Sequence, residues 1–355
     1  MRMITGLAMA MAALACAAPP PVKKGPLIGG PVEKKTAPAR PVTVKEAKPP
    51  VSAAKPKVAA KPKPAKTNQT MKPAANGPMA PYRGAIAVDA VSGRVLFADH
   101  IDRKGYPASV TKLMTLLLVL EDIKAGLYSL SDSAVASAFA AAQEPSSVAL
   151  KAGQSMTIDD LMKSIMVKSA NDAAIVLAEH SGRAHGAPAD PPDAALKMFV
   201  ERMNAKALML GMKSTKYASP NGLPPPRGSG RDFDVSTAED LAKLGRVIAS
   251  MPEALAYTSL PVCTVTDGGG KPLKLQNHNH FVPGCRDPDG LCVPIEGCDG
   301  LKTGYTAASG SSIILTAERN GRRVVAVVLG SAGRHAREEA AGRILRDALD
   351  SISVW

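Results

Sequence analysis

The sequence has no apolar run long enough to cross a membrane comfortably; its N-terminal run, residues 4–18, is too short and is bounded by prolines. Because Arg2 precedes this run, it is typical of an export signal, and we predict a signal peptide at residues 1–18. Cleavage after Ala17 satisfies the small-x-small rule. Cleavage before Cys16 is the alternative, a loose match to the site at which lipoproteins are acylated. Either signal sends the chain to the periplasm or the cell envelope.

Acidic and aromatic residues are almost absent from residues 19–81, where Pro, Ala, Lys and Val predominate. Such a segment has too little apolar surface to offset its chain entropy, so we predict a disordered linker. Of the formal net charge of +13, residues 18–80 hold +11 and Arg2 one, which leaves +1 for the remainder. No nucleic acid is therefore expected as a partner. The basic linker is expected to meet an anionic wall polymer or membrane surface, or to act only as a solvated tether.

Cysteines are few, and one of the five falls in the signal. An even number of cysteines in the rest of an exported chain predicts disulfides, with all three pairings left open. A zinc site with His278 and His280 is the alternative, and the absence of any C-x-x-C spacing argues against it. We therefore expect no metal and no cofactor. The disulfide candidates are Cys263, Cys285, Cys292 and Cys298.

The folded part, residues 82–355, is predicted to have strands at both ends and helices between them. The predicted strands are residues 84–89, 94–98, 299–306, 312–317 and 324–329. The predicted helices are residues 108–126, 158–167, 171–179, 193–210, 236–250 and 337–349. This order indicates an α+β fold in which the two ends complete one sheet and a helical lobe, at about residues 127–255, is inserted in its middle.

A serine and a lysine lie three residues apart, Ser109 and Lys112, on one face at the start of the first predicted helix. A serine hydroxyl becomes a good nucleophile when a base takes its proton, and a lysine with a lowered pKa can be that base. Alone the pair is weak evidence, since Ser52 and Lys55 have the same spacing inside the linker. Ser169, in Ser169-Ala170-Asn171, can relay a proton to a leaving amine.

A third motif, Lys302-Thr303-Gly304, completes the trio found in serine β-lactamases and penicillin-binding proteins. Asn171 can orient the lysine base or the substrate backbone. Lys302 supplies positive potential and Thr303 can bind a substrate carboxylate, while Gly304 leaves room for a substrate strand at the sheet edge. The backbone N–H groups of Ser109 and Tyr305 are candidates for an oxyanion hole.

The residues around these motifs carry a more specific resemblance. Residues 107–112, 166–174, 203–207, 277–279 and 299–306 resemble the serine-type D-alanyl-D-alanine carboxypeptidases, which are low-molecular-mass penicillin-binding proteins. The resemblance covers about residues 82–350. It implies a five-stranded antiparallel sheet flanked by helices, beside an all-helical lobe. It also implies removal of the terminal D-Ala from peptidoglycan stem peptides that end in D-Ala-D-Ala, through an acyl-enzyme on the motif serine, and covalent inhibition by β-lactams.

Within this family an arginine at the last strand-to-helix turn helps to bind the substrate carboxylate, and Arg337 resembles it. Residues 283–298 look like an insertion that either braces a loop or narrows the cleft. An endopeptidase that cuts cross-links is the alternative function and would use the same residues. A β-lactamase is disfavoured because Glu201 and Asn204 miss the Glu-x-x-x-Asn spacing by one residue. A non-catalytic wall-binding protein is disfavoured because every polar residue that the mechanism needs is present.

Overall fold

The structure is a computed structural model and describes residues 81–352 except residues 227, 287–289 and 291. The predicted signal peptide, and the predicted linker up to residue 80, lie outside the described residues. All described residues belong to one compact unit of the chain. Within them, no helix is both long and apolar enough to span a bilayer.

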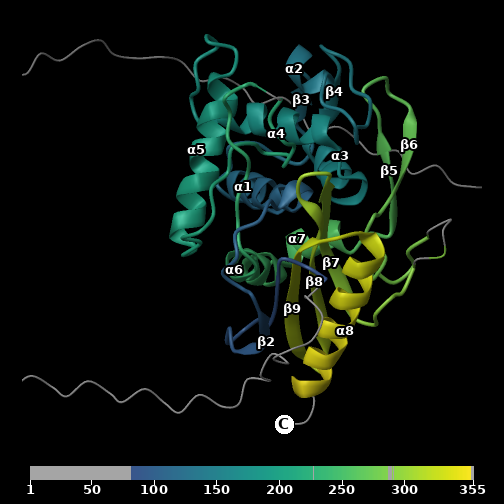
Figure 1. Cartoon of the computed structure of the whole chain (residues 1–355). Coiled ribbons are helices and arrows are strands. Elements are labelled where there is room, and N and C mark those ends of the chain that lie inside the picture. Colours follow the sequence, from purple (N-terminus) through teal and green to yellow (C-terminus); the bar gives the residue numbers. More distant parts are fainter. Residues whose placement is uncertain (1–80, 227, 287–289, 291, 353–355) are drawn as a thin grey trace, which may run out of the picture. The chain divides into compact units, whose positions relative to one another are not determined.

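A five-stranded antiparallel sheet with the strand order β2-β1-β9-β8-β7 forms the base of the fold (Figure 1). Its strands are β1 (Gly84–Asp89), β2 (Val95–Asp99), β7 (Cys298–Thr306), β8 (Gly310–Arg319) and β9 (Arg322–Ser331). Ile86 of β1 lies opposite Val327 of β9, so the two ends of the folded part meet in one sheet. The predicted α+β class and antiparallel sheet are confirmed.

Both faces of the sheet are covered, because successive side chains of a strand point to opposite sides. In β9, Val325 and Val327 pack into the apolar cluster on the side of the helical part. Val324 and Val328 pack into a second cluster beneath α8 (Arg334–Ile352), which lies along the other face in Figure 1. A strand buried on both faces reads as an almost continuous apolar run, as β9 does.

The helical part of the chain lies between β2 and β7 in sequence. Its helices are α1 (Lys112–Lys124), α2 (Ala138–Ala141), α3 (Ile158–Lys163), α4 (Asn171–Ala184), α5 (Ala194–Met209), α6 (Ala238–Ala249) and α7 (Pro252–Thr258). Two antiparallel strand pairs accompany them, β3 (Ser133–Val135) with β4 (Ser155–Thr157), and β5 (Val262–Thr266) with β6 (Pro272–Gln276). Helix α6 packs against β1, β8 and β9, and so covers the sheet face opposite α8.

Several helix ends differ from the sequence prediction, and two have a clear physical reason. Helix α4 continues through Gly182 to Ala184, past the predicted end at residue 179. A Cβ at Gly182 would lie 2.1 Å from the backbone oxygen of Ala195, so this glycine permits close packing of α4 on α5 rather than ending a helix. The helix predicted over 158–167 ends at Lys163 and continues as a π-helical turn, residues 164–168. Helices α2 and α7 and the β5–β6 hairpin were not predicted.

The predicted disulfides are not present in this structure. Cys298 is buried in β7, and burial raises the pKa of its thiol to about 12. Cys263, Cys285 and Cys292 are partly buried, and no disulfide joins any of these four cysteines. All four are described residues, and the disulfide prediction stays a prediction.

Candidate active site

Ser109 lies in a 3-10 helix, Ala108–Thr111, that leads directly into α1. The sequence placed it in the first turn of the α-helix itself. Ala108, the residue before the serine, has a positive φ of 49°, which few non-glycine residues adopt. The two side chains of the motif still lie together, as predicted, with Lys112 Nζ 3.0 Å from Ser109 Oγ.

Lys112 is fully buried, and its amine is held by three oxygen atoms. Besides Ser109 Oγ, the Nζ atom donates to Asn171 Oδ1 at 2.7 Å and to the backbone oxygen of Asn221 at 2.7 Å. Burial, followed by repulsion from Lys302, lowers the pKa of Lys112 well below its usual range. A lowered pKa favours the neutral amine, which is the state that accepts a proton from serine.

Ser169 follows the π-helical turn and has a left-handed backbone, with φ of 60°. This bend ends one helix and lets α4 begin at Asn171, so that both side chains of the motif reach the site. Asn171 N donates to the backbone oxygen of Ser146 at 2.7 Å. Next to it, the buried Asp172 carboxylate accepts hydrogen bonds from backbone N–H groups, Val148 among them, which ties the loop before β4 to the start of α4.

Strand β7 passes beside the 3-10 helix and brings the third motif to Ser109. A Cβ at Gly304 would lie 2.7 Å from the backbone oxygen of Pro107 and 3.1 Å from Ser109 N, so only glycine allows this approach. Lys302 is buried in the same strand, and burial, followed by repulsion from Arg337, lowers its pKa to about 7.

A cavity of about 660 Å³ opens over these groups, and we call it the catalytic cavity. Its lining includes Ser109, Ser169, Thr303 and Tyr305, and the Tyr305 side chain is 65% exposed. The structure therefore brings the predicted nucleophile, the relay serine and the edge of β7 around one space. A concave site with a few convergent polar groups is the expected form of a binding site.

Arg337 also lines the catalytic cavity, but from inside α8 rather than from the turn before it. Its Nε and Nη2 atoms donate to the two carboxylate oxygens of Glu338, both at 2.6 Å. Burial alone would raise the pKa of Glu338, but hydrogen bonds from Arg337 and His280 outweigh it and hold that pKa below its usual range. The paired carboxylate fixes the orientation of the guanidinium beside the cavity.

Two residues of the site were missed by sequence reasoning. Asn221, in the sequence Ser219-Pro220-Asn221, supplies the backbone oxygen that accepts from Lys112 Nζ. Asp234 is buried and accepts hydrogen bonds from Thr111 Oγ1 and from the backbone N–H groups at 218 and 219. The turn-forming Pro-Asn-Gly sequence is the only local signal for this loop, since Asp234 resembles any loop aspartate.

The residues considered for a β-lactamase base lie elsewhere. The amide of Asn204 bonds to the backbone of Tyr217 at both ends, at 2.9 Å and 2.8 Å. Asn204 thus anchors a loop to α5, and neither it nor Glu201 is among the described residues that line the catalytic cavity.

Comparison with known proteins identifies the family. A sequence model of the D-alanyl-D-alanine carboxypeptidase family matches residues 71–333. D-alanyl-D-alanine carboxypeptidase DacC of Escherichia coli is 30% identical over 261 residues, which cover 72% of this chain and 58% of that protein. DacF of Bacillus subtilis is 28% identical over 249 residues, 70% of this chain and 57% of that protein. The chain thus spans somewhat under three fifths of the length of these two relatives.

Solved structures give the same result. Penicillin-binding protein D2 of Listeria monocytogenes, in its ampicillin-bound form, superposes with a TM-score of 0.61 at 30% identity, covering 77% of this chain and 99% of that one. Penicillin-binding protein 6B of Escherichia coli superposes with a TM-score of 0.63 at 28% identity, covering 79% and 81%. With the serine–lysine pair, the two further motifs and this fold, the chain belongs to the D-alanyl-D-alanine carboxypeptidase family of penicillin-binding serine peptidases.

Proposed function

We propose that the chain is a serine DD-carboxypeptidase that removes the terminal D-Ala from peptidoglycan stem peptides. The observation that carries this proposal is the 3.0 Å contact between Ser109 Oγ and the buried amine of Lys112, at the edge of β7. A buried lysine with a lowered pKa can serve as the base that a serine nucleophile needs. The names of the relatives support the same substrate class.

In the first half of the reaction, Ser109 Oγ attacks the carbonyl carbon of the penultimate D-Ala while Lys112 Nζ accepts the hydroxyl proton. The backbone N–H groups of Ser109 and Tyr305 are proposed to stabilise the oxyanion. The C–N bond then breaks as the leaving amine receives the proton from Lys112, relayed by Ser169. The products of this half are free D-Ala and an ester on Ser109.

In the second half, water attacks the ester and Lys112 Nζ accepts one of its protons. The ester bond breaks, and the Ser109 oxygen takes that proton back. The peptide leaves one residue shorter, with a new carboxylate. Lys112 thus ends the cycle neutral, ready for the next serine attack.

The terminal carboxylate of the substrate is proposed to bind at Thr303, close to Lys302 and Arg337. Thr303 and Arg337 line the catalytic cavity, and Lys302 lies buried behind it. Two cations with one hydroxyl donor favour a single carboxylate at this place. Arg337 keeps its orientation through Glu338, whose negative charge also limits the mutual repulsion of the two cations.

β-Lactams are proposed to acylate Ser109 in the same geometry. The D2 protein of Listeria monocytogenes, to which this chain is similar, has been solved in ampicillin-bound and cefotaxime-bound forms. A β-lactam carbonyl would take the place of the scissile amide, and its carboxylate the place of the substrate carboxylate.

We further propose that the chain works outside the cytoplasmic membrane, with residues 19–81 as a basic tether to an anionic wall polymer or membrane surface. The support is the charge of +11 in residues 18–80 and the export signal before it. Replacing the lysines of this segment by glutamine should abolish salt-sensitive co-sedimentation with isolated wall polymer. Unchanged co-sedimentation would reduce the segment to a spacer. Mass analysis of the N-terminus decides between cleavage after Ala17 and acylation of Cys16.

The experiment that tests the proposed activity is release of D-Ala from a peptide ending in D-Ala-D-Ala, together with covalent labelling by a fluorescent penicillin. We expect both in the wild-type protein and neither in Ser109→Ala. The matched control is Ser131→Ala, an exposed serine outside the catalytic cavity, which should behave as wild type. Undiminished labelling of Ser109→Ala would refute the assignment of the nucleophile.

A further inference from the structure

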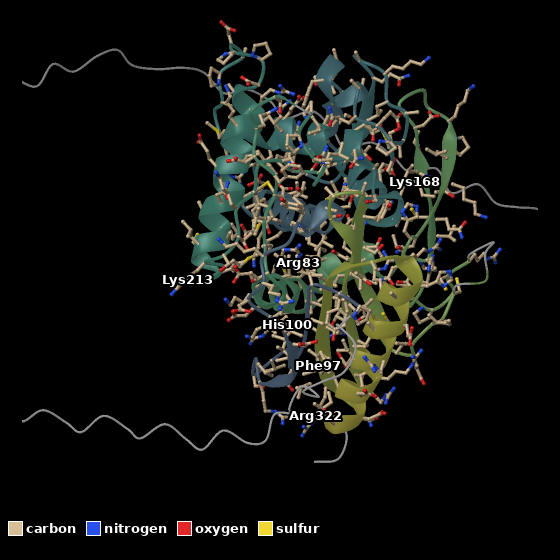
Figure 2. The ribbon with its side chains drawn as sticks, viewed as in Figure 1. Arg83, Phe97, His100, Lys168, Lys213 and Arg322 are labelled. Atoms are coloured by element: carbon tan, nitrogen blue, oxygen red, sulfur yellow. The ribbon has the colours of Figure 1, made fainter. Side chains whose placement is uncertain are left out.

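Two arginines of the first turn of α8 line the catalytic cavity, Arg334 and Arg337, and no acidic side chain is among its described lining residues. In Figure 2 this turn is the upper end of the yellow helix, below the labelled Lys168, with which Arg334 lines a neighbouring cavity. A buried pair of side chains, His280 and Glu338, connects the two arginines. Buried titratable groups beside a binding site are candidates for a role in it.

The contacts of His280 decide which of its ring nitrogens carries the proton. Nδ1 lies 3.0 Å from Glu338 Oε1, and an ionised carboxylate only accepts, so Nδ1 is the donor. Arg334 Nη2 lies closer to Nε2, at 2.7 Å, than to Nδ1, at 3.3 Å. Because an arginine N–H only donates, Nε2 is the acceptor in this contact. The neutral ring with its proton on Nδ1 is therefore the form that satisfies both neighbours.

Glu338 transmits the position of His280 to Arg337. Its Oε1 atom accepts from His280 Nδ1 and from Arg337 Nη2, while Oε2 accepts from Arg337 Nε. The bidentate pair fixes the plane of the guanidinium, and His280 fixes the carboxylate from the other side. The N–H groups on Nη1 of Arg337 are not used by Glu338. They are the donors that Arg337 can offer to a ligand in the catalytic cavity.

We propose that His280 is a positioning residue for the substrate carboxylate, because it holds Arg337 through Glu338 and holds Arg334 directly. This inference rests on the proposed function, in which the carboxylate of the leaving residue binds near Arg337. With both arginines already held, less side-chain freedom is lost when the substrate binds. A peptide whose C-terminus is an amide offers no charge to the arginines. The network therefore sets the preference for a free C-terminal carboxylate and takes no part in the proton transfers at Ser109.

A purely electrostatic role of Glu338 predicts an effect of the opposite sign, which makes the proposal testable. A negative charge beside the cavity opposes the binding of a carboxylate, so its removal without a change of shape would lower KM. A positioning role predicts that the same change raises KM. In Glu338→Gln the amide oxygen can still accept, but the amide N–H groups meet donors of Arg337 or His280, and the bidentate pair is lost.

The experiment compares KM of the full-length protein for two peptides ending in D-Ala-D-Ala, one with a free carboxylate and one with a C-terminal amide. Glu338→Gln and His280→Phe should each raise KM for the free carboxylate about tenfold, the low end for a lost hydrogen bond to a charged group. The KM for the amide should change much less. His280→Asn keeps an N–H that can donate to Glu338, so its KM should stay close to that of wild type. Glu339→Gln is the matched control, an exposed neighbour in α8 that is not among the lining residues.

Thermal unfolding shows which variants are folded, and if Glu338→Gln is not, the two His280 variants decide. The inference is overturned by an unchanged or lower KM of folded Glu338→Gln for the free carboxylate. Equal changes in KM for both peptides, or a His280→Asn that behaves like His280→Phe, also overturn it. All of these outcomes leave the proposed function standing. By contrast, loss of D-Ala release and of penicillin labelling in the wild-type protein would refute the proposed function itself.

Discussion

Thr111 Oγ1 donates a hydrogen bond of 2.9 Å to Asp234 Oδ2, although 123 positions separate the two residues in sequence. Thr111 stands between the serine and the lysine of the motif. The same carboxylate accepts hydrogen bonds from the backbone N–H groups at 218 and 219, at the start of the turn that presents Asn221 to Lys112. The buried Asp234 thus joins the 3-10 helix and the turn at 218–222, which together position the lysine base.

We expect Asp234→Ala to slow acylation by penicillin at least tenfold, because the 3-10 helix and the turn at 218–222 lose their shared anchor. Asp234→Asn should restore most of the rate, since its amide can accept from the backbone and donate to the hydroxyls. The control is Asp232→Ala, whose exposed carboxylate pairs only with Lys216 among the described side chains. If Asp234→Ala acylates at the wild-type rate while folded, the positioning role is refuted.

We expect Lys112→Arg to acylate with penicillin about 10³-fold more slowly than wild type. A guanidinium does not lose its proton at accessible pH, so it cannot act as the base. The measurement is the second-order rate constant of labelling, with thermal unfolding to show that the variant is folded. Lys124→Arg, at the exposed end of α1, should label normally. A wild-type rate in Lys112→Arg would exclude proton transfer to this lysine.

The pH dependence of KM should follow the protonation state of Lys302. Its pKa of about 7 means that the ammonium is charged below pH 7 and increasingly neutral above it. KM for a peptide ending in D-Ala-D-Ala should therefore rise between pH 6 and pH 9. The same peptide with a C-terminal amide has no carboxylate to bind, so its KM should stay nearly constant. Parallel curves for the two peptides would show that Lys302 does not bind the carboxylate.

A substitution at Gly222 tests the contact between the turn at 218–222 and the 3-10 helix. Its φ is +80°, and a Cβ there would lie 1.9 Å from the backbone oxygen of Ala108. Gly222→Ala should therefore lower the free energy of unfolding by about 3 kcal/mol or more, through backbone strain and a clash. Gly126→Ala meets the same strain, with φ of +76°, but nothing within 4 Å, and should cost about 1 kcal/mol. Equal losses, measured by denaturant unfolding, would show that the clash relaxes without cost.

The local sequence determined the elements and the chemical groups of this protein. Short apolar runs between turn residues predicted the strands of the sheet. The predicted helix start at residue 158 is explained by Thr157, whose side chain accepts from Asp160 N at 3.1 Å. The spacing of Ser109 and Lys112 next to an apolar helical run predicted that the two side chains lie together where that helix begins. These features depend on interactions between residues close in sequence, which is why the sequence shows them.

The tertiary structure decided which distant groups surround Lys112 and the leaving group. The positions of the backbone oxygen of Asn221 and of the carboxylate of Asp234 depend on loops that meet only when the sheet and the helical part pack together. The role of Gly182 could not be predicted from the local sequence either, because its close approach to Ala195 arises only when α4 packs on α5. A single sequence holds no periodicity that marks such contacts, because their partners lie too far apart along the chain for local propensity to join them.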